Sequence, residues 1–98
     1  MFVGLARFEI HIPESSSLKD KRSIIKSMIK RTEQRFNVSI SEVEYHDLWQ
    51  RSAIGAAVVG VSETTVKKGL DLIGTELERD YGAEITSVEK KVISFDDL

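Results

Sequence analysis

The sequence predicts one α+β domain made of two strand-helix-strand units. Apolar residues alternate with polar ones, or run on with β-branched types, in residues 2–12, 38–45, 53–61 and 83–95, as in β-strands. Between the first and second of these segments, and between the third and fourth, apolar residues recur every three or four positions, as in amphipathic helices. The 98 residues contain no cysteine but are enough to bury one core, so we expect a single domain over residues 1–98.

The first helix is expected to begin at Leu18, because Ser17 is a good N-cap and Asp20 follows three positions later. Asn37 is expected to end the helix in a left-handed conformation. The helical spacing predicts a sheet-facing stripe, with Lys19, Lys26 and Lys30 on the opposite, solvated side. The expected members of the stripe are Leu18, Ile25, Ile29, Thr32 and Phe36.

The second and third strands are joined by the loop HDLWQR, residues 46–51. In residues 38–45 the apolar face changes sides between Ile40 and Val43, which predicts a β-bulge or an edge strand that twists away. Residues 53–61 are small or β-branched on both faces, which favours a central position in the sheet.

Ser62 is expected to cap the second helix, and Gly82 to end it. Gly69 and Gly74 weaken this helix by about 1 kcal/mol each relative to alanine, unless close packing on the sheet requires them. The apolar stripe of the helix consists of Val66, Leu70, Ile73, Leu77 and Tyr81. The charged segment Glu89 to Lys91 marks the last strand as an edge strand.

A β-α-β-β-α-β order in about a hundred residues predicts the ferredoxin-like split βαβ fold. With right-handed crossovers, the four-stranded antiparallel sheet has the order 4-1-3-2, and both helices cover one face. The other face is apolar near the start of the first strand, and such a patch usually marks a contact surface. We therefore expect Val3, Leu5 and Arg7 to form an interface, with a homodimer as the expected assembly.

Positive charge is concentrated in one segment of an acidic chain. Residues 18–37 carry seven basic and two acidic residues, whereas the whole chain has a net charge of −2. The predicted topology brings SLKDKR, HDLWQR and the Tyr81–Gly82 turn to one end of the domain. Such a basic end is suited to an anionic partner. The candidate nucleic-acid-binding residues are Lys19, Lys21, Arg22, Trp49, Gln50 and Arg51.

Each of these candidates also has a structural interpretation. Lys21 and Arg22 lie at the positive end of the helix dipole, so they require an anion, either a phosphate or an internal carboxylate such as Glu42 or Asp47. Trp49 can stack on a base or fold back over the end of the core.

Three segments, SLKDKRSIIKS, RFNVSISEVE and DLWQRSAIGAAVVG, resemble hallmark segments of the YlxP-like family of small bacterial proteins of unknown function. The resemblance implies a ferredoxin-like fold. It also implies a setting in translation, because genes of this family commonly lie among those for translation initiation and ribosome maturation, near ribosome-binding factor A.

No catalytic, metal-binding or cofactor motif stands out. His11 and His46, with Asp47, offer a base and an orienter, but no activated nucleophile accompanies them. No apolar run is long enough to span a membrane and no signal peptide is recognisable, so we expect no membrane partner and a cytoplasmic location. The leading hypothesis is a noncatalytic RNA- or ribosome-associated binding module. The alternative is a homo-oligomeric protein-interaction adaptor that uses the open sheet face.

Overall fold

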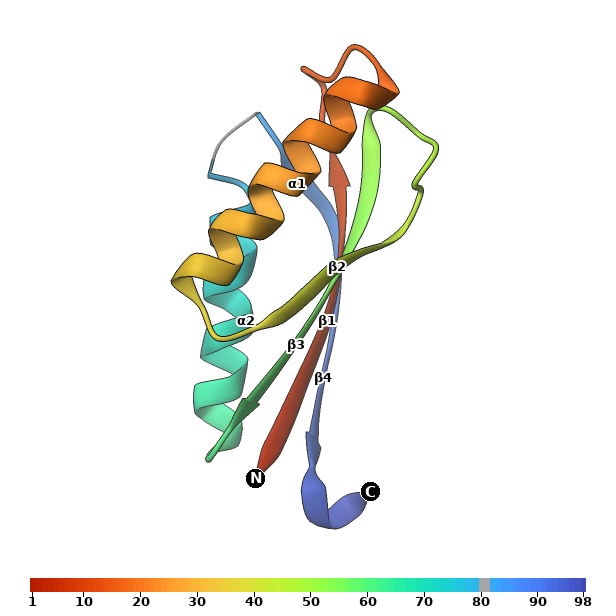
Figure 1. Cartoon of the computed structure of the whole chain (residues 1–98). Coiled ribbons are helices and arrows are strands. Elements are labelled where there is room, and N and C mark those ends of the chain that lie inside the picture. Colours follow the sequence, from red (N-terminus) through yellow and green to blue (C-terminus); the bar gives the residue numbers. More distant parts are fainter. Residues whose placement is uncertain (80–81) are drawn as a thin grey trace.

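The computed structural model describes residues 1–79 and 82–98. The predicted order of elements is confirmed (Figure 1). The elements are β1 (Phe2–His11), α1 (Leu18–Arg35), β2 (Ser39–Glu44), β3 (Arg51–Gly60), α2 (Glu63–Leu77) and β4 (Glu84–Ser94), followed by a short 3-10 turn (Phe95–Asp97).

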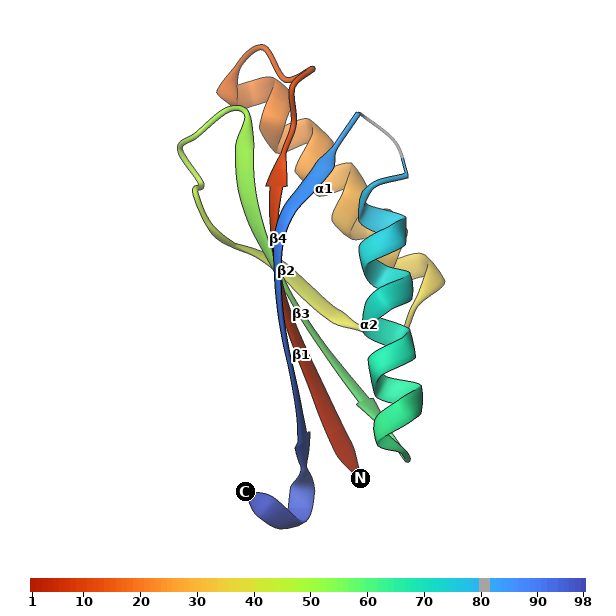
Figure 2. The ribbon, with the colours of Figure 1, turned by 180° about the vertical axis from the view of Figure 1, so that it is seen from behind.

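The described strands form one antiparallel sheet in the order β2-β3-β1-β4, as the sequence predicts. Both helices lie on the same side of this sheet, and within residues 1–79 and 82–98 no helix covers the other side (Figures 1 and 2). The fold is therefore ferredoxin-like, with β1 and β3 in the centre and β2 and β4 at the edges.

Both predicted N-caps are confirmed. The Ser17 side chain accepts a hydrogen bond from the Asp20 N–H at 3.0 Å, and the Asp20 carboxylate accepts one from the Ser16 N–H. In α2, the Ser62 side chain accepts from the Thr65 N–H at 3.2 Å. These bonds satisfy amide groups that have no partner within the helix.

The predicted helix ends are wrong. α1 ends at Arg35, and Phe36 already has extended backbone angles, so the chain enters β2 without a left-handed residue at Asn37. α2 ends at Leu77, well before Gly82, although Gly82 does have a positive φ of 64°. Tyr81, the last residue of the predicted stripe, lies outside the described residues.

The core lies between the sheet and the helices, but the buried stripe of α1 is rotated from the predicted one. Leu18, Ile29 and Phe36 are only partly buried. The buried residues of α1 are Lys21, Ile24, Ile25, Met28 and Thr32. The helical spacing already places Lys21 over the apolar side of the first turn. It is buried there together with Ile24 and Met28, which flank the predicted stripe.

The bulge predicted in the second strand is confirmed between Glu42 and Glu44. It allows Glu42 to reach Lys21 on the helix side, whereas Glu44 reaches Arg7 on the open side. Tyr45 follows with a positive φ of 64°, which reverses the chain into the 46–50 loop. In the described part of the chain, neither helix is long and apolar enough to cross a membrane.

Candidate binding surfaces

The loop before α1 and the 46–50 loop meet at one end of the domain, as predicted (Figure 1). Tyr81, from the third predicted loop, lies outside the described residues. The Gln50 side chain donates to the carbonyl oxygens of Ser15 at 3.1 Å and Pro13 at 3.3 Å. The Ile12 N–H donates to the Gln50 carbonyl at 2.8 Å. Gly82 lies beside Glu14, and a Cβ added at this glycine would be 3.1 Å from Oε1 of Glu14. The loop end is thus held together largely by hydrogen bonds to backbone atoms.

Lys21 is not a phosphate contact, and this prediction is corrected. The residue is fully buried, with an exposed fraction of 0%. Its Nζ lies 2.8 Å from Oε2 of Glu42 and donates to the Tyr45 carbonyl at 2.5 Å. Glu42 also accepts from the Ser52 hydroxyl at 2.6 Å. The internal ion pair that the sequence offered as an alternative therefore describes Lys21.

Lys19 and Arg22 are exposed, and they continue into a longer row of cations. Together with Lys26 and Lys30 they lie on the solvent side of α1, about one residue per turn. We call these four residues the α1 basic row. None of the four has an acidic partner within residues 1–79 and 82–98.

Most other cations of the described chain are paired. Lys67 pairs with Glu63, Lys90 pairs with Asp71, and Arg35 reaches Glu76. Exposed lysines without a carboxylate partner in the described residues occur elsewhere only as Lys68 and Lys91. Uncompensated positive charge is thus concentrated on the outer side of α1.

Trp49 does not close over the core. Its exposed fraction is 51%, and the neighbouring Leu48 is 44% exposed. Gln50, by contrast, uses its amide group on the Pro13 and Ser15 carbonyls. Trp49 is therefore available to a partner, whereas the polar atoms of Gln50 are already in use.

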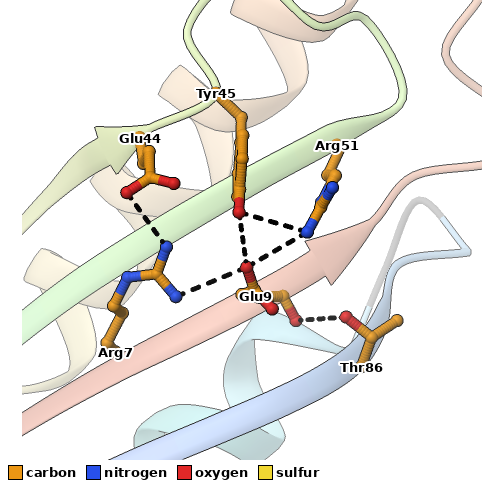
Figure 3. A network of polar contacts seen from close by, with 6 residues as sticks. All are labelled: Arg7, Glu9, Glu44, Tyr45, Arg51 and Thr86. Carbon is orange, nitrogen blue, oxygen red and sulfur yellow. Dashed lines mark hydrogen bonds and ion pairs between the residues drawn. The ribbon is translucent and has the colours of Figure 1, made fainter.

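Arg51 begins β3 at the loop end, and its side chain lies over the open sheet face (Figure 3). Its Nη2 is 3.2 Å from the Glu9 carboxylate and 3.1 Å from the Tyr45 hydroxyl. Its guanidinium also stacks on the Tyr45 ring, with Cζ 4.1 Å from the ring centroid. Arg51 therefore serves first to hold Tyr45 and Glu9 in place.

Tyr45 is the centre of this group. Its hydroxyl donates to Glu9 at 2.8 Å, while Arg7 reaches Glu9 at 3.4 Å and Glu44 at 3.3 Å. The hydrogen bond from Tyr45 is the main cause that lowers the pKa of Glu9, and Arg51 and Arg7 lower it further. The same hydrogen bond raises the pKa of Tyr45. We call these five residues the Tyr45 cluster.

Next to the Tyr45 cluster, the centre of the open face is apolar. Leu5 is 39% exposed and Val59 is 67% exposed, and Val43 packs over Gly55 beside them. Leu5 separates two grooves. A groove of about 310 Å³ runs over Gly55 and Ala57 toward β2, and one of about 230 Å³ runs toward Glu89 and Lys91 of β4. The predicted interface residues Val3, Leu5 and Arg7 thus lie on this face.

The structure offers little for catalysis or metal binding in its described part. The His46 ring contacts the Glu42 carbonyl at 3.2 Å, and His11 lies 3.8 Å from Glu84. In residues 1–79 and 82–98, no three histidine or acidic side chains are grouped closely enough to hold a metal ion.

The sequence interpretation missed Tyr45, Glu9 and Glu44 as members of one group. One signal for it was present, because Arg7 and Glu9 lie on the same face of β1. The positive φ that swings Tyr45 back over the sheet has no comparable signal, since tyrosine rarely adopts it.

Comparisons with known proteins place this chain in a family. A family model described as "Protein of unknown function (DUF503)" matches residues 3–90. The uncharacterized protein YlxP of Bacillus subtilis (strain 168) is 41% identical over 71 residues, which cover 72% of this chain and 77% of that protein. The resemblance to YlxP-like proteins is thereby confirmed.

Two solved structures share the fold. One is a de novo designed protein with a ferredoxin fold, with a TM-score of 0.57 and 18% identity over 96% of this chain and 87% of the other. The second is the de novo designed protein Foldit4, with a TM-score of 0.52 and 13% identity over 96% and 98%. At these identities the likeness concerns the fold alone. With the family model matching nearly all of its length, the chain belongs to the DUF503 family of proteins of unknown function.

Proposed function

We propose that this protein is a noncatalytic RNA-binding module that contacts the RNA backbone with the α1 basic row. The observation that carries the proposal is the row itself, in which Lys19, Arg22, Lys26 and Lys30 are exposed and lack acidic partners in the described chain. Lysine and arginine contacts to phosphates supply most of the sequence-independent affinity for nucleic acids.

The spacing of the row suits a phosphate backbone. From Lys19 to Lys30 the helix rises by about 16 Å, at about 1.5 Å per residue, so the four side chains can follow several successive phosphates. Ser23 is exposed next to the row and can bond a ribose hydroxyl. The acidic remainder of the chain would repel RNA, which favours binding through this one face.

Ribosomal RNA is the ligand that we propose. The support is the genomic setting of YlxP-like proteins among genes for translation initiation and ribosome maturation. A cytoplasmic location follows from this proposal. Trp49 is proposed as an additional contact, because its exposed ring can stack on an unpaired base.

The proposal is tested by a charge-neutral double variant, Lys26→Gln with Lys30→Gln, measured by fluorescence anisotropy on ribosomal RNA fragments. We expect a loss of affinity of at least about tenfold, because two phosphate contacts disappear. The matched control is Lys68→Gln with Lys91→Gln, which removes the same charge from exposed residues outside the row. Equal losses in both double variants, or no RNA binding by the wild type, would rule out the proposed site.

The open sheet face supports a second candidate function, the assembly of a homodimer that serves as a protein-interaction adaptor. Leu5 projects between two grooves, so the Leu5 of one copy can enter the groove over Gly55 and Ala57 of the other. The neighbouring Tyr45 cluster contains two arginines and two glutamates, so it has no net charge to repel a second copy. A two-fold interface between identical faces needs this kind of self-complementarity.

Light scattering coupled to size-exclusion chromatography tests the dimer. We expect the wild type to have the mass of two chains, and Leu5→Glu to have the mass of one while keeping its circular dichroism spectrum. Leu72→Glu is the matched control, because Leu72 is exposed on α2, away from the open sheet face. A wild type that stays monomeric at high concentration would exclude this second function.

A further inference from the structure

A separate, solvent-open cavity lies on the helix layer, between the last turns of α1 and α2. Its volume is about 560 Å³, within the range of small-molecule sites. Two half-exposed arginines, two glutamates and two large apolar residues dominate its lining. These residues are Arg35, Arg79, Glu76, Glu78, Phe36 and Leu72.

Glu76 anchors the two arginines. It is nearly completely buried, with an exposed fraction of 5%. Oε1 lies 3.1 Å from Nε of Arg35, and Oε2 lies 3.6 Å from Nη1 of Arg79. Arg31 approaches from the side, with Nε 3.4 Å from Oε2 and Nη2 donating to the Glu76 carbonyl at 3.0 Å. One buried carboxylate thus orients several guanidinium groups.

Arg35 and Arg79 retain donors that Glu76 does not use. Each guanidinium has five N–H donors, whereas Glu76 has only two carboxylate oxygens, and one of these, Oε2, also faces Arg31. The side chains of Arg35 and Arg79 are 52% and 54% exposed, so their remaining donors can reach a ligand. Neither has a second carboxylate partner in the described residues. Exposed guanidinium donors next to each other are suited to the bidentate recognition of a phosphate.

The rest of the cavity is suited to a flat, partly polar ring. Phe36 and Leu72 provide apolar surface, and Leu72 is 48% exposed. Glu78 lines the cavity, and its Oε2 is held by the Ile85 N–H at 3.0 Å. A carboxylate at this position opposes a simple inorganic anion but can accept a hydrogen bond from an amino group on a ring.

We propose that this cavity binds a nucleoside monophosphate. Arg35 and Arg79 bind the phosphate, Phe36 and Leu72 contact the base, and Glu78 accepts from the exocyclic amino group. This site differs from the α1 basic row, because Arg35 faces α2 through Glu76, whereas the row faces solvent. Failure of RNA binding at the row would therefore leave this proposal intact.

The experiment is calorimetric titration of the protein with adenosine 5′-monophosphate, compared with adenosine and with inorganic phosphate. We expect saturable binding of the nucleotide that is at least about tenfold tighter than binding of adenosine alone or of phosphate alone, because the ring and phosphate contacts act together. Arg35→Gln and Arg79→Gln should each weaken binding about tenfold or more, since each removes a charge-assisted hydrogen bond. Lys68→Gln, which lies outside the cavity, should leave the affinity unchanged.

A second measurement does not depend on the folding of the variants. In the wild type, nucleotide should shift the amide NMR signals of Phe36, Leu72 and Thr75, which line the cavity. Shifts confined to the α1 basic row or the open sheet face would overturn the proposal, as would the absence of saturable binding at millimolar nucleotide. If an RNA oligomer with a 5′-monophosphate displaces the nucleotide, the ligand is an RNA end. If the nucleotide stays bound in the presence of this oligomer, the ligand is a free nucleotide.

Discussion

Lys21 and Glu42 form an ion pair inside the protein, with Nζ 2.8 Å from Oε2 and no part of Lys21 exposed to solvent. The pair joins the first turn of α1 to β2 at the bulge, and the Tyr45 carbonyl accepts a further hydrogen bond from the same ammonium group. It therefore fixes the loop end, and its role is structural.

Substitution of Lys21 by methionine should destabilise the protein by about 3 kcal/mol, because the partly buried Glu42 loses its partner. Urea unfolding measures the effect. The control Lys19→Met changes an exposed residue of the same turn and should alter the free energy of unfolding by less than about 0.5 kcal/mol. Adding Glu42→Gln to Lys21→Met should restore part of the lost free energy of unfolding. A double variant that is less stable than Lys21→Met alone would contradict the ion-pair interpretation.

RNA affinity should fall with salt in proportion to the number of phosphate contacts. With four contacts from the α1 basic row, the slope of log K against log salt should be about −3. Lys30→Gln should reduce the magnitude of this slope by about 1, and Lys68→Gln should leave it unchanged. A slope near zero for the wild type would show that the row does not bind phosphates.

Tyr45→Phe should destabilise the protein at neutral pH, because Glu9 loses the hydrogen bond from the Tyr45 hydroxyl. The phenylalanine ring would keep the contact with Arg51, so the variant isolates that hydrogen bond. Since the pKa of Glu9 is lowered in the folded state, its interactions stabilise the protein above the ordinary glutamate pKa of 4.5. That contribution is lost as pH falls through the lowered value. The difference in urea stability between Tyr45→Phe and wild type should therefore shrink below pH 4.5, and a difference independent of pH would contradict the assignment.

Two glycines should respond in opposite ways to alanine. A Cβ at Gly69 has no atom within 4 Å, so Gly69→Ala should stabilise α2 by about 0.5 to 1 kcal/mol. A Cβ at Gly4 would overlap Val66 Cγ1, so Gly4→Ala should destabilise the protein by about 1 to 3 kcal/mol. Thermal unfolding of both variants provides the comparison, and a stabilised Gly4→Ala protein would show that α2 packs less closely on β1 than described.

The sequence by itself determined the order of elements, both N-caps, the change of face within β2 and the order of strands in the sheet. These features depend on local periodicity and on side chains three or four residues apart, such as Ser17 and Asp20. The handedness of crossovers then left one arrangement of the strands. For Gly74 the tertiary structure supplies the neighbour, because a Cβ added there would lie 3.1 Å from Phe8 Cε1, tighter than an ordinary contact.

The tertiary structure decided which charges are free and which are used internally. Lys19 and Lys21 stand in the same basic segment, yet one is exposed and the other is buried against Glu42. Likewise, the Arg51 side chain is held internally by Glu9 and Tyr45. The energy of a charge depends on the distance to its partner and on the surrounding solvent, and neither quantity is contained in the local sequence.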